Sequence, residues 1–437
     1  MDQVLNLFTQ YKNPDGLLKS VSHTFVFRVI GLLLIYLSQV LLARLMGPKA
    51  YGDYTVIITI VNMLLAISLF GMDTGALRFI PSALAKQEHG AVHGFIRFSY
   101  RLITFISIGC SIALFVFLLA KAKKFNIGFS EGLFWAVVLL PFLAFIYQAS
   151  SVLRALQQIK ISMLPVYILL PVSIGLGCIY YYNEHNKLPV DAAMMINLIC
   201  TFAVCIFINR KAGKTVNQII PEAEPVMKPG LWTSVSSVIF ISTLLNMLLK
   251  QSDILFVSYF LGNTKAGIYG AAVKISTLVA IGLSVTDYVF MPKIAALWEK
   301  RQVMKLQKLV REGSRQILLI TVPIAVVLLA SGKWLLGFFG DAFSNAYLPL
   351  VILIVGQLVN AATGMVGGML TMTGNQKMFL IFYIVAFAAQ VLLNILLIPI
   401  PGLGILGASI ASSFGLILLN VIGFRYVKRK MKISASI

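Results

Sequence analysis

Three basic side chains lie inside long apolar segments of this sequence, where a charge is costly. Arg28 lies in the first such segment, and Lys250 and Lys274 lie in the second half of the chain. A charged side chain near the centre of a bilayer costs about 2.5–3.5 kcal/mol on insertion scales, so it normally faces a cavity or a partner. Guanidinium and ammonium groups are good partners for phosphate oxygens. The three residues therefore predict a cationic cavity that accepts an anion.

Neutral polar residues share helix faces with these cations. Gln39 follows Arg28 by about three helical turns, which returns its side chain to the same face. Asn246 precedes Lys250 by one turn of the same segment, so these two side chains also share a face. The residues that we predict to bind the substrate in the cavity are Arg28, Gln39, Asn246, Lys250 and Lys274.

One carboxylate also lies in the interior of an apolar segment. Asp253 follows Lys250 by about one helical turn and has two interpretations. It could bind a coupling ion, H+ or Na+, or it could neutralise Lys250 in a structural ion pair. Arg28 has an alternative as well, because it lies only about one turn inside the membrane and could extend to the cytoplasmic headgroups.

Charged residues also mark the inner ends of two apolar segments. Asp73 and Arg78 follow the second segment, and Asp287 follows the eighth. Ion pairs at these positions could hold two halves of a membrane protein together, so we predict a gating role for all three residues. Ordinary exposure at the membrane surface is the alternative.

The sequence offers no pattern for covalent or metal chemistry. A P-loop, an HExxH motif and a G-x-S-x-G turn are all missing from it. His89 and His93 are spaced for one helix face, but no carboxylate or thiolate completes a set of metal ligands. The four cysteines lie in apolar segments without a CxxC pair. We therefore predict no metal, no cofactor and no enzyme activity.

Composition predicts an all-α integral membrane protein. Hydrophobic residues make up 59% of the 437 residues and charged residues 12%. Continuous apolar runs exclude a barrel, whose strands would alternate. About 20 mainly apolar residues span a bilayer, and on that basis we predict about twelve spans. They are approximately 23–46, 53–72, 97–120, 132–153, 163–182, 190–209, 232–261, 266–290, 316–339, 346–372, 378–399 and 405–426.

Basic residues predict the orientation of these spans. They concentrate in Lys293–Arg315 and Arg425–Lys432, on the side that also holds both termini. The positive-inside rule therefore places both termini in the cytoplasm. The net charge of +21 reflects this topology and contact with anionic lipids, and not binding of nucleic acid.

An internal repeat divides the chain. Gly47–Tyr54 (GPKAYGDY) recurs as Gly262–Tyr269 (GNTKAGIY), and Leu153–Lys160 corresponds to Leu370–Lys377. A hydrophilic stretch at 209–229 separates the halves. We predict two six-helix lobes related by duplication, residues 1–215 and 216–437. Chance alignment of apolar helices is the alternative. Duplicated bundles around a central site are typical of transporters.

Several segments resemble signatures of bacterial polysaccharide flippases in the multidrug/oligosaccharidyl-lipid/polysaccharide exporter superfamily. They are Leu42–Tyr54, Phe70–Phe79 and Gln251–Gly262, which runs into Ala266–Gly270. The resemblance implies a flippase in the bacterial inner membrane that translocates a polyprenyl-pyrophosphate-linked oligosaccharide, such as an O-antigen or capsule repeat unit. It implies two bundles that open alternately to either side, with the pyrophosphate meeting cationic cavity residues, a pattern that Arg28 fits. The implied partners are this substrate, membrane lipids and a polysaccharide polymerase, around a monomeric transport unit.

Two other functions compete with this one. A cation-coupled multidrug exporter would share the architecture, but its cavity would be expected to be acidic, whereas the first span here carries Arg28 and no Asp or Glu. A membrane glycan polymerase or ligase would need a large outer loop. The longest outer segments, Lys121–Glu131 and Asn183–Asp191, are too short for one.

Overall fold

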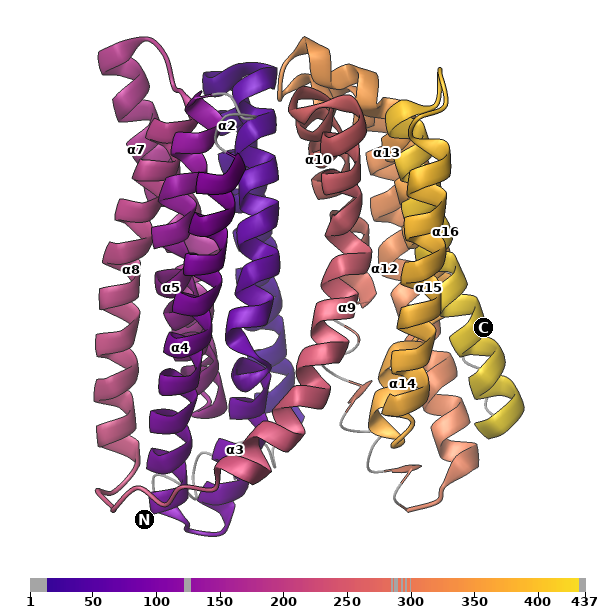
Figure 1. The fold of residues 1–437 in the computed structure, drawn as a ribbon. Coiled ribbons are helices and arrows are strands. Elements are labelled where there is room, and N and C mark those ends of the chain that lie inside the picture. The colour runs from indigo at the N-terminus through magenta and orange to yellow at the C-terminus, as the bar shows by residue number, and fades with distance from the viewer. Residues whose placement is uncertain are drawn as a thin grey trace. The chain divides into compact units, whose positions relative to one another are not determined.

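A computed structural model describes most of the chain and shows helices throughout the described part, with no strand (Figure 1). The residues it describes are 14–121, 127–283, 286, 290–291, 294, 297–298 and 300–431. This confirms the all-α prediction. The physical reason is that a helix satisfies every backbone hydrogen bond within its own segment, which an apolar environment requires.

Long helices alternate with short ones in both halves of the chain. The first half contains α2 (Pro14–Leu69), α3 (Met72–Ala85), α4 (His89–Lys121), α5 (Ile127–Ala155), α6 (Ile159–Leu164), η3 (Pro165–Leu169), α7 (Leu170–His185) and α8 (Val190–Ile219). The second half contains α9 (Pro229–Leu261), α10 (Asn263–Ser276), η4 (Thr277–Ala280), α12 (Val303–Gly337), η5 (Asp341–Ala346), α13 (Tyr347–Ala362), α14 (Val366–Met372), α15 (Gln376–Leu397), α16 (Gly404–Tyr426) and η6 (Val427–Met431).

Eleven helices in the described part are long and apolar enough to cross a membrane. The predicted spans 23–46 and 53–72 overlap one continuous stretch, Phe27–Ala85, which begins four residues after the first predicted span does. Gly47 interrupts that stretch, because its φ of 73° and ψ of 170° are not helical. A single glycine can adopt this conformation at no steric cost. Two spans can therefore follow each other without a longer loop.

The repeat has a counterpart in local backbone geometry. Gly47 has φ 73° and ψ 170°, and Gly262 has φ 84° and ψ 164°. The turns after α5 and α14 also match, since Gln157 and Gly374 both have positive φ, 63° and 80°. Equivalent residues thus turn the chain in the same way in both halves, which supports duplication over chance alignment.

A further matching turn was not found from sequence. Gln87 precedes α4 with a φ of 59°, and Arg301 precedes α12 with a φ of 52°. In the first turn Glu88 N donates to Ala83 O at 2.9 Å, and in the second the same pattern recurs with Gln302 as donor at 3.0 Å. Lys86 and Lys300 precede the two turns, but the turn residues Gln87 and Arg301 differ, so the backbone reveals the correspondence of the turns.

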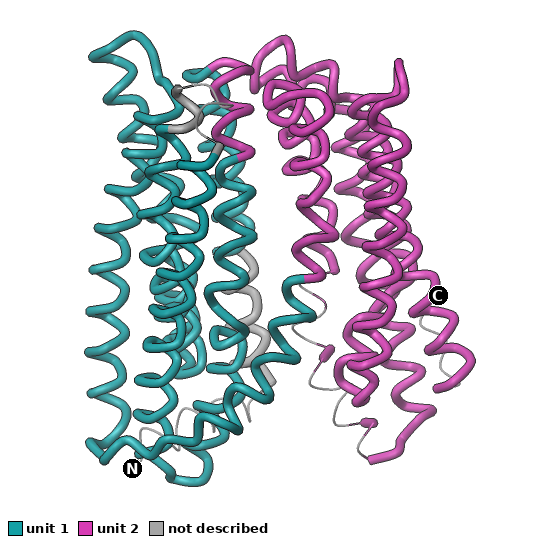
Figure 2. The backbone as a smooth tube through the Cα atoms, viewed as in Figure 1, with its two compact units in different colours: residues 1–46, 57–244 teal, residues 47–56, 245–437 magenta. Residues whose placement is uncertain are grey.

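The described chain packs as two compact units (Figure 2). Unit 1 comprises residues 1–46 and 57–244, and unit 2 comprises 47–56 and 245–437. The first part of α9 therefore packs in unit 1, and the segment Gly47–Val56 packs in unit 2 although the helices on either side of it belong to unit 1. The lobe boundary at residues 215–216 stays a prediction, since it follows chain order and not packing.

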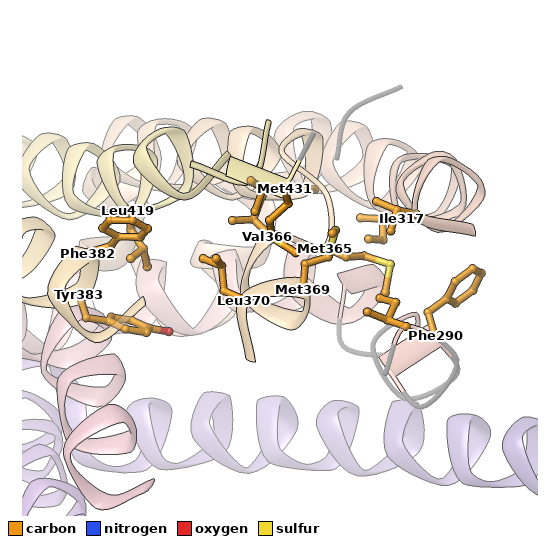
Figure 3. Packing of buried hydrophobic residues seen from close by; sticks show 14 of the residues in the cluster. Phe290, Ile317, Met365, Val366, Met369, Leu370, Phe382, Tyr383, Leu419 and Met431 are labelled. Atoms are coloured by element: carbon orange, nitrogen blue, oxygen red, sulfur yellow. The ribbon is translucent and has the colours of Figure 1, made fainter. Parts of the chain in front are cut away.

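The core of unit 2 contains a cluster of buried apolar side chains centred on α14 (Figure 3). Met365, Val366, Met369 and Leu370 lie at its centre and are at most 1% exposed. Between membrane helices such side chains stabilise the structure through close van der Waals packing. This cluster fixes the short helix α14 among the longer helices of unit 2.

Candidate functional site

Lys274 lies on α10 and is held by an aromatic group. Its Nζ donates a hydrogen bond to Tyr51 Oη at 3.1 Å and lies 5.3 Å from the centre of the same ring. Tyr51 is fully buried and makes edge contacts with Phe339 and Phe343, at centroid distances of 6.2 and 5.7 Å. A half-buried ammonium is stabilised by such a ring face and hydroxyl. Lys274 therefore has a structural contact beside its predicted substrate role.

Asp253 on α9 is fully buried inside unit 2. Its Oδ2 accepts a hydrogen bond from Tyr269 Oη at 2.5 Å, and its Oδ1 accepts one from Ile254 N at 3.0 Å. The hydroxyl of Ser412 on α16 is a further hydrogen-bond partner. A buried carboxyl needs such donors to offset its lost hydration.

Lys250 does not pair with Asp253. Among the described residues the ion pair present is Lys228–Glu88, and the Lys250 side chain is exposed. Residues three apart on a helix point about 60° apart around its axis. The rotation explains how Asp253 points into unit 2 while Lys250, one turn earlier, does not.

Two buried amides on α15 were missed by the sequence reasoning. Gln390 and Asn394 on α15 are fully buried, and neither finds a hydrogen-bond partner in the described part of the chain for its side-chain nitrogen or oxygen. Buried polar groups normally have a partner, so these amides mark a place where water or a ligand would be stabilised. Two amide side chains one turn apart on an otherwise apolar helix are a pattern from which a buried polar site could have been predicted.

Close contacts between glycines and α15 define how α15 packs on α16. A Cβ atom at Gly415 would lie 2.9 Å from Gln390 Oε1, and one at Gly407 would lie 2.8 Å from backbone atoms of Leu397. The two helices are therefore antiparallel. Continuing that register brings Asn394 level with the turn of α16 that carries Ser412.

The two copies of the repeated motif meet inside unit 2. A Cβ atom at Gly52 would lie 2.2 Å from Asn263 O, and one at Gly267 would lie 2.6 Å from Gly52 Cα. Asn263 Nδ2 donates to Asp53 Oδ1 at 2.6 Å, and the hydroxyl of Ser258 donates to Asn263 Oδ1. We call this packing of Gly47–Val56 against Asn263–Gly270 the motif contact. Sequence identified the glycines but not their meeting.

Arg28 and Gln39 lie on α2 in unit 1, and both are half-buried. Gly31, one turn after Arg28, packs so closely on η3 that a Cβ there would lie 2.5 Å from Tyr167 Cβ. Arg28 shares that helix face by its spacing. The π-helical turn η3 is of a kind that often occurs at functional sites.

The predicted gating residues have different surroundings. Asp73 lies in the first turn of α3 and interacts electrostatically with Arg154 of α5, inside unit 1. The Nε of Arg154 is buried without a hydrogen bond in the described part. Arg78 is exposed. Asp287 lies outside the described residues.

The predicted substrate-binding residues are thus divided between the two units. Arg28 and Gln39 belong to unit 1, and Lys250 and Lys274 belong to unit 2, together with the half-buried Asn246. A single cavity formed by all five stays a prediction. Within the described residues no group of three or more His, Cys, Asp or Glu side chains could hold a metal ion.

Comparison with known sequences gives one family. A family model described as "Polysaccharide biosynthesis protein" matches residues 17–298. The chain is also 21% identical over 435 residues to an uncharacterised membrane protein of Methanocaldococcus jannaschii, covering 95% of this chain and 84% of that protein.

Solved structures of similar fold are transporters of one superfamily. An inward-facing multidrug resistance MATE transporter of the MOP superfamily aligns with a TM-score of 0.76 at 15% identity, covering 93% of this chain and 98% of its own. A MATE protein in complex with MaL6 aligns at 0.72 and 14% identity, with 95% and 96% covered. A MOP superfamily transporter from Pyrococcus furiosus, described as having a binding pocket of reverse polarity, aligns at 0.70 and 15% identity, with 95% and 96% covered.

Proposed function

Because this chain belongs to the polysaccharide biosynthesis protein family and has the fold of MOP superfamily transporters, we propose that it flips a polyprenyl-pyrophosphate-linked oligosaccharide from the inner to the outer leaflet. The observation that carries this proposal is Lys250. It is exposed in the interior of the apolar helix α9 and forms no ion pair among the described residues. An ammonium group in that position is available to a phosphate oxygen.

The physical task of such a protein is to remove a desolvation barrier. A glycan headgroup that crosses hydrocarbon unassisted loses many hydrogen bonds together, each costing roughly 2–7 kcal/mol. A polar cavity keeps these bonds satisfied and needs no covalent chemistry. In this proposal Arg28 and Lys250 bind the pyrophosphate, Gln39 and Asn246 contact the glycan, and Lys274 joins them when Tyr51 releases it.

Alternating access supplies the movement in this proposal. Gly47–Val56 is flanked on both sides by helices of unit 1 but packs in unit 2. In the proposed cycle the motif contact stays intact within unit 2 while the protein opens to either side. Asp73 and Arg78, with Asp287, would act at the inner side. The transport unit would be a monomer in the bacterial inner membrane, with both termini in the cytoplasm and a polysaccharide polymerase as partner.

A vesicle assay tests the proposal. Purified protein is reconstituted with a labelled lipid-linked oligosaccharide, and the fraction of headgroups that reach the opposite leaflet is measured. Lys250→Gln removes a charged hydrogen bond and should slow flipping about tenfold. Lys250→Arg should retain most activity, and Lys265→Gln, at an exposed position at the start of α10, should match the unchanged protein. Full activity in a variant with Arg28, Lys250 and Lys274 all replaced by Ala would refute the cationic cavity.

Asp253 is the proposed site of coupling to H+ or Na+. Its carboxylate offers hard oxygen ligands of the kind that such cations prefer. Asp253→Asn should therefore abolish the response of flipping to an ion gradient while flipping without a gradient remains. If the gradient response of Asp253→Asn equals that of the unchanged protein, this residue does not couple.

Multidrug export is the second candidate, and the similarity to MATE multidrug transporters favours it. Efflux of a lipophilic cation from the same vesicles distinguishes the two. Cation efflux without glycan flipping would replace our first proposal by this one.

A further inference from the structure

The segment between α8 and α9 is fixed on α4 within unit 1. Val226 N donates a hydrogen bond to Gly90 O at 2.9 Å, and His93 Nε2 lies 3.1 Å from Pro221 O. Lys228 continues the contact through its ion pair with α4's neighbour Glu88 at 2.7 Å. Residues 220–228, which we call the linker, therefore have a defined path across the end of α4.

Glycines on α4 make this close path feasible. A Cβ atom at Gly94 would lie 2.0 Å from Val226 O, and one at Gly90 would lie 2.4 Å from Glu224 O. Any side chain at either position would overlap backbone atoms of the linker. The two glycines lie one turn apart on the helix, so together they allow the linker backbone to lie directly against α4.

The linker roofs a pocket of about 840 Å³ between α4, α5 and α8. Its polar lining includes Arg97 and Tyr100 of α4, Asn209 of α8, and Glu222 and Glu224 of the linker. Tyr100 Oη donates to Asn209 Oδ1 at 2.7 Å, which satisfies these two groups with each other. His93 also lines the pocket and already contacts Pro221 O, so the charged residues and Asn217 are the groups left to bind a ligand.

Charges of both signs line this pocket without neutralising each other. Arg97, Glu222 and Glu224 are exposed, and none of them takes part in an ion pair within the described part of the chain. A purely anionic ligand would meet the two carboxylates, and a purely cationic ligand would meet the guanidinium. A ligand that carries both a phosphate and an ammonium group would complement all three, by charge-assisted hydrogen bonds.

The pocket lies where phospholipid headgroups are expected. α4 contains 33 residues, which at about 1.5 Å each exceed the roughly 30 Å hydrocarbon core. Its first turns and the last turns of α8 carry the basic residues Arg97, Arg101, Arg210, Lys211 and Lys214. Basic residues of this kind mark the cytoplasmic headgroup level.

We propose that this pocket binds a phosphoethanolamine group at the cytoplasmic face of the membrane. The phosphate is bound by Arg97 and the primary ammonium by Glu222 and Glu224. The group could be the headgroup of a phospholipid or part of a soluble molecule, since the recognised atoms are the same. This site is separate from the proposed cavity residues and does not depend on what the protein transports.

Gly213 provides a test that leaves the charges untouched. It lines the pocket on α8, and a Cβ atom there would meet no heavy atom within 4 Å. Gly213→Phe therefore fills part of the pocket, whereas Gly213→Ala adds one methyl group at the same place and serves as its control. Both changes favour the helix, so neither should prevent folding.

The measurement is retention of lipid by the purified full-length protein in native mass spectrometry, after reconstitution in equal amounts of phosphatidylethanolamine and phosphatidylglycerol. We expect the unchanged protein and Gly213→Ala to retain phosphatidylethanolamine preferentially. Gly213→Phe should lose this preference, and Arg97→Gln should weaken it about tenfold, whereas Arg101→Gln on the next turn should not.

Glycerophosphoethanolamine, added in solution, distinguishes the two sources of the group. Displacement of the retained lipid by this soluble compound assigns the site to the phosphoethanolamine group itself, and resistance to it shows that the acyl chains contribute and assigns the site to a phospholipid. Retention of phosphatidylglycerol equal to that of phosphatidylethanolamine would overturn the proposal. The same preference in Gly213→Phe as in Gly213→Ala would overturn it as well.

Discussion

Gly52→Ala is expected to destabilise the motif contact directly. The added Cβ atom would lie 2.2 Å from Asn263 O and 2.6 Å from Asn263 C. Both atoms belong to the backbone, so no rotation of a side chain can relieve the overlap. Gly47–Val56 would have to move away from α10. Overpacking of this kind costs about 1–3 kcal/mol, and we expect the free energy of unfolding to fall by that amount.

Gly267→Ala tests the same contact from its other side. Its Cβ atom would lie 2.6 Å from Gly52 Cα. Once one substitution has separated the two segments, the second meets less resistance. The double variant should therefore lose less stability than the sum of the single variants, with a coupling of about 0.5–3 kcal/mol.

Denaturant unfolding in detergent, followed by tryptophan fluorescence, measures both effects. Gly109→Ala on α4 is the matched control, because a Cβ atom there meets nothing within 4 Å. That change should be neutral or raise the free energy of unfolding by about 0.5–1 kcal/mol. If Gly52→Ala were as stable as Gly109→Ala, the close approach of the two motif copies would be refuted.

Three further variants test other groups. Asn263→Ala removes a hydrogen-bond donor from the carboxylate of Asp53, a residue that is 8% exposed. The free energy of unfolding should fall by about 1–3 kcal/mol. An unchanged value would show that the carboxylate has other donors. Asn394→Leu replaces an amide without a partner in the described part and should raise stability in the same assay; a loss would show that the amide binds something. Lys228 holds the pKa of Glu88 below its usual 4.5 by a hydrogen bond and by its charge. The linker contact is therefore fully present above pH 4.5. It is lost as the pH falls through the lowered pKa of Glu88. The protection factor of Val226 N against hydrogen exchange should fall there, and Glu88→Gln should remove this pH dependence.

The helices and the main turns of the molecule could be predicted from sequence, because they depend on local rules. The spacing of Gly47 and Gly262 predicted two equivalent turns, and the continuous apolar segments predicted helices that span a membrane. Such features need only a few neighbouring residues to be specified. The turns at Gln87 and Arg301 were missed because neither residue is a glycine, although both adopt positive φ.

The side-chain contacts of the candidate site residues could not be predicted from sequence, because they involve residues that are distant along the chain. Lys274 meets Tyr51, which lies far from it in sequence and resembles an ordinary tyrosine at a membrane surface. Asp253 was considered as a partner of Lys250, yet its carboxylate accepts a hydrogen bond from Tyr269 of the next helix. Spacing along one helix gives the face of a residue but not the helix that the face meets.

The two halves share the backbone geometry of their turns but differ in their charged residues. At the spacing that relates Gly47 to Gly262, the buried Tyr54 corresponds to the buried Tyr269, whereas Asp253 corresponds to Ser38 and Lys274 to Thr59. The turns and the tyrosine are retained, because changing them would disturb helix packing in either half. Charges inside a membrane protein are costly and are retained only where something binds them. Arg28 is a cation of the first half, so both halves carry charge, but Asp253 and Lys274 have uncharged counterparts at this spacing. The coupling carboxylate that we propose therefore has no equivalent in the first half.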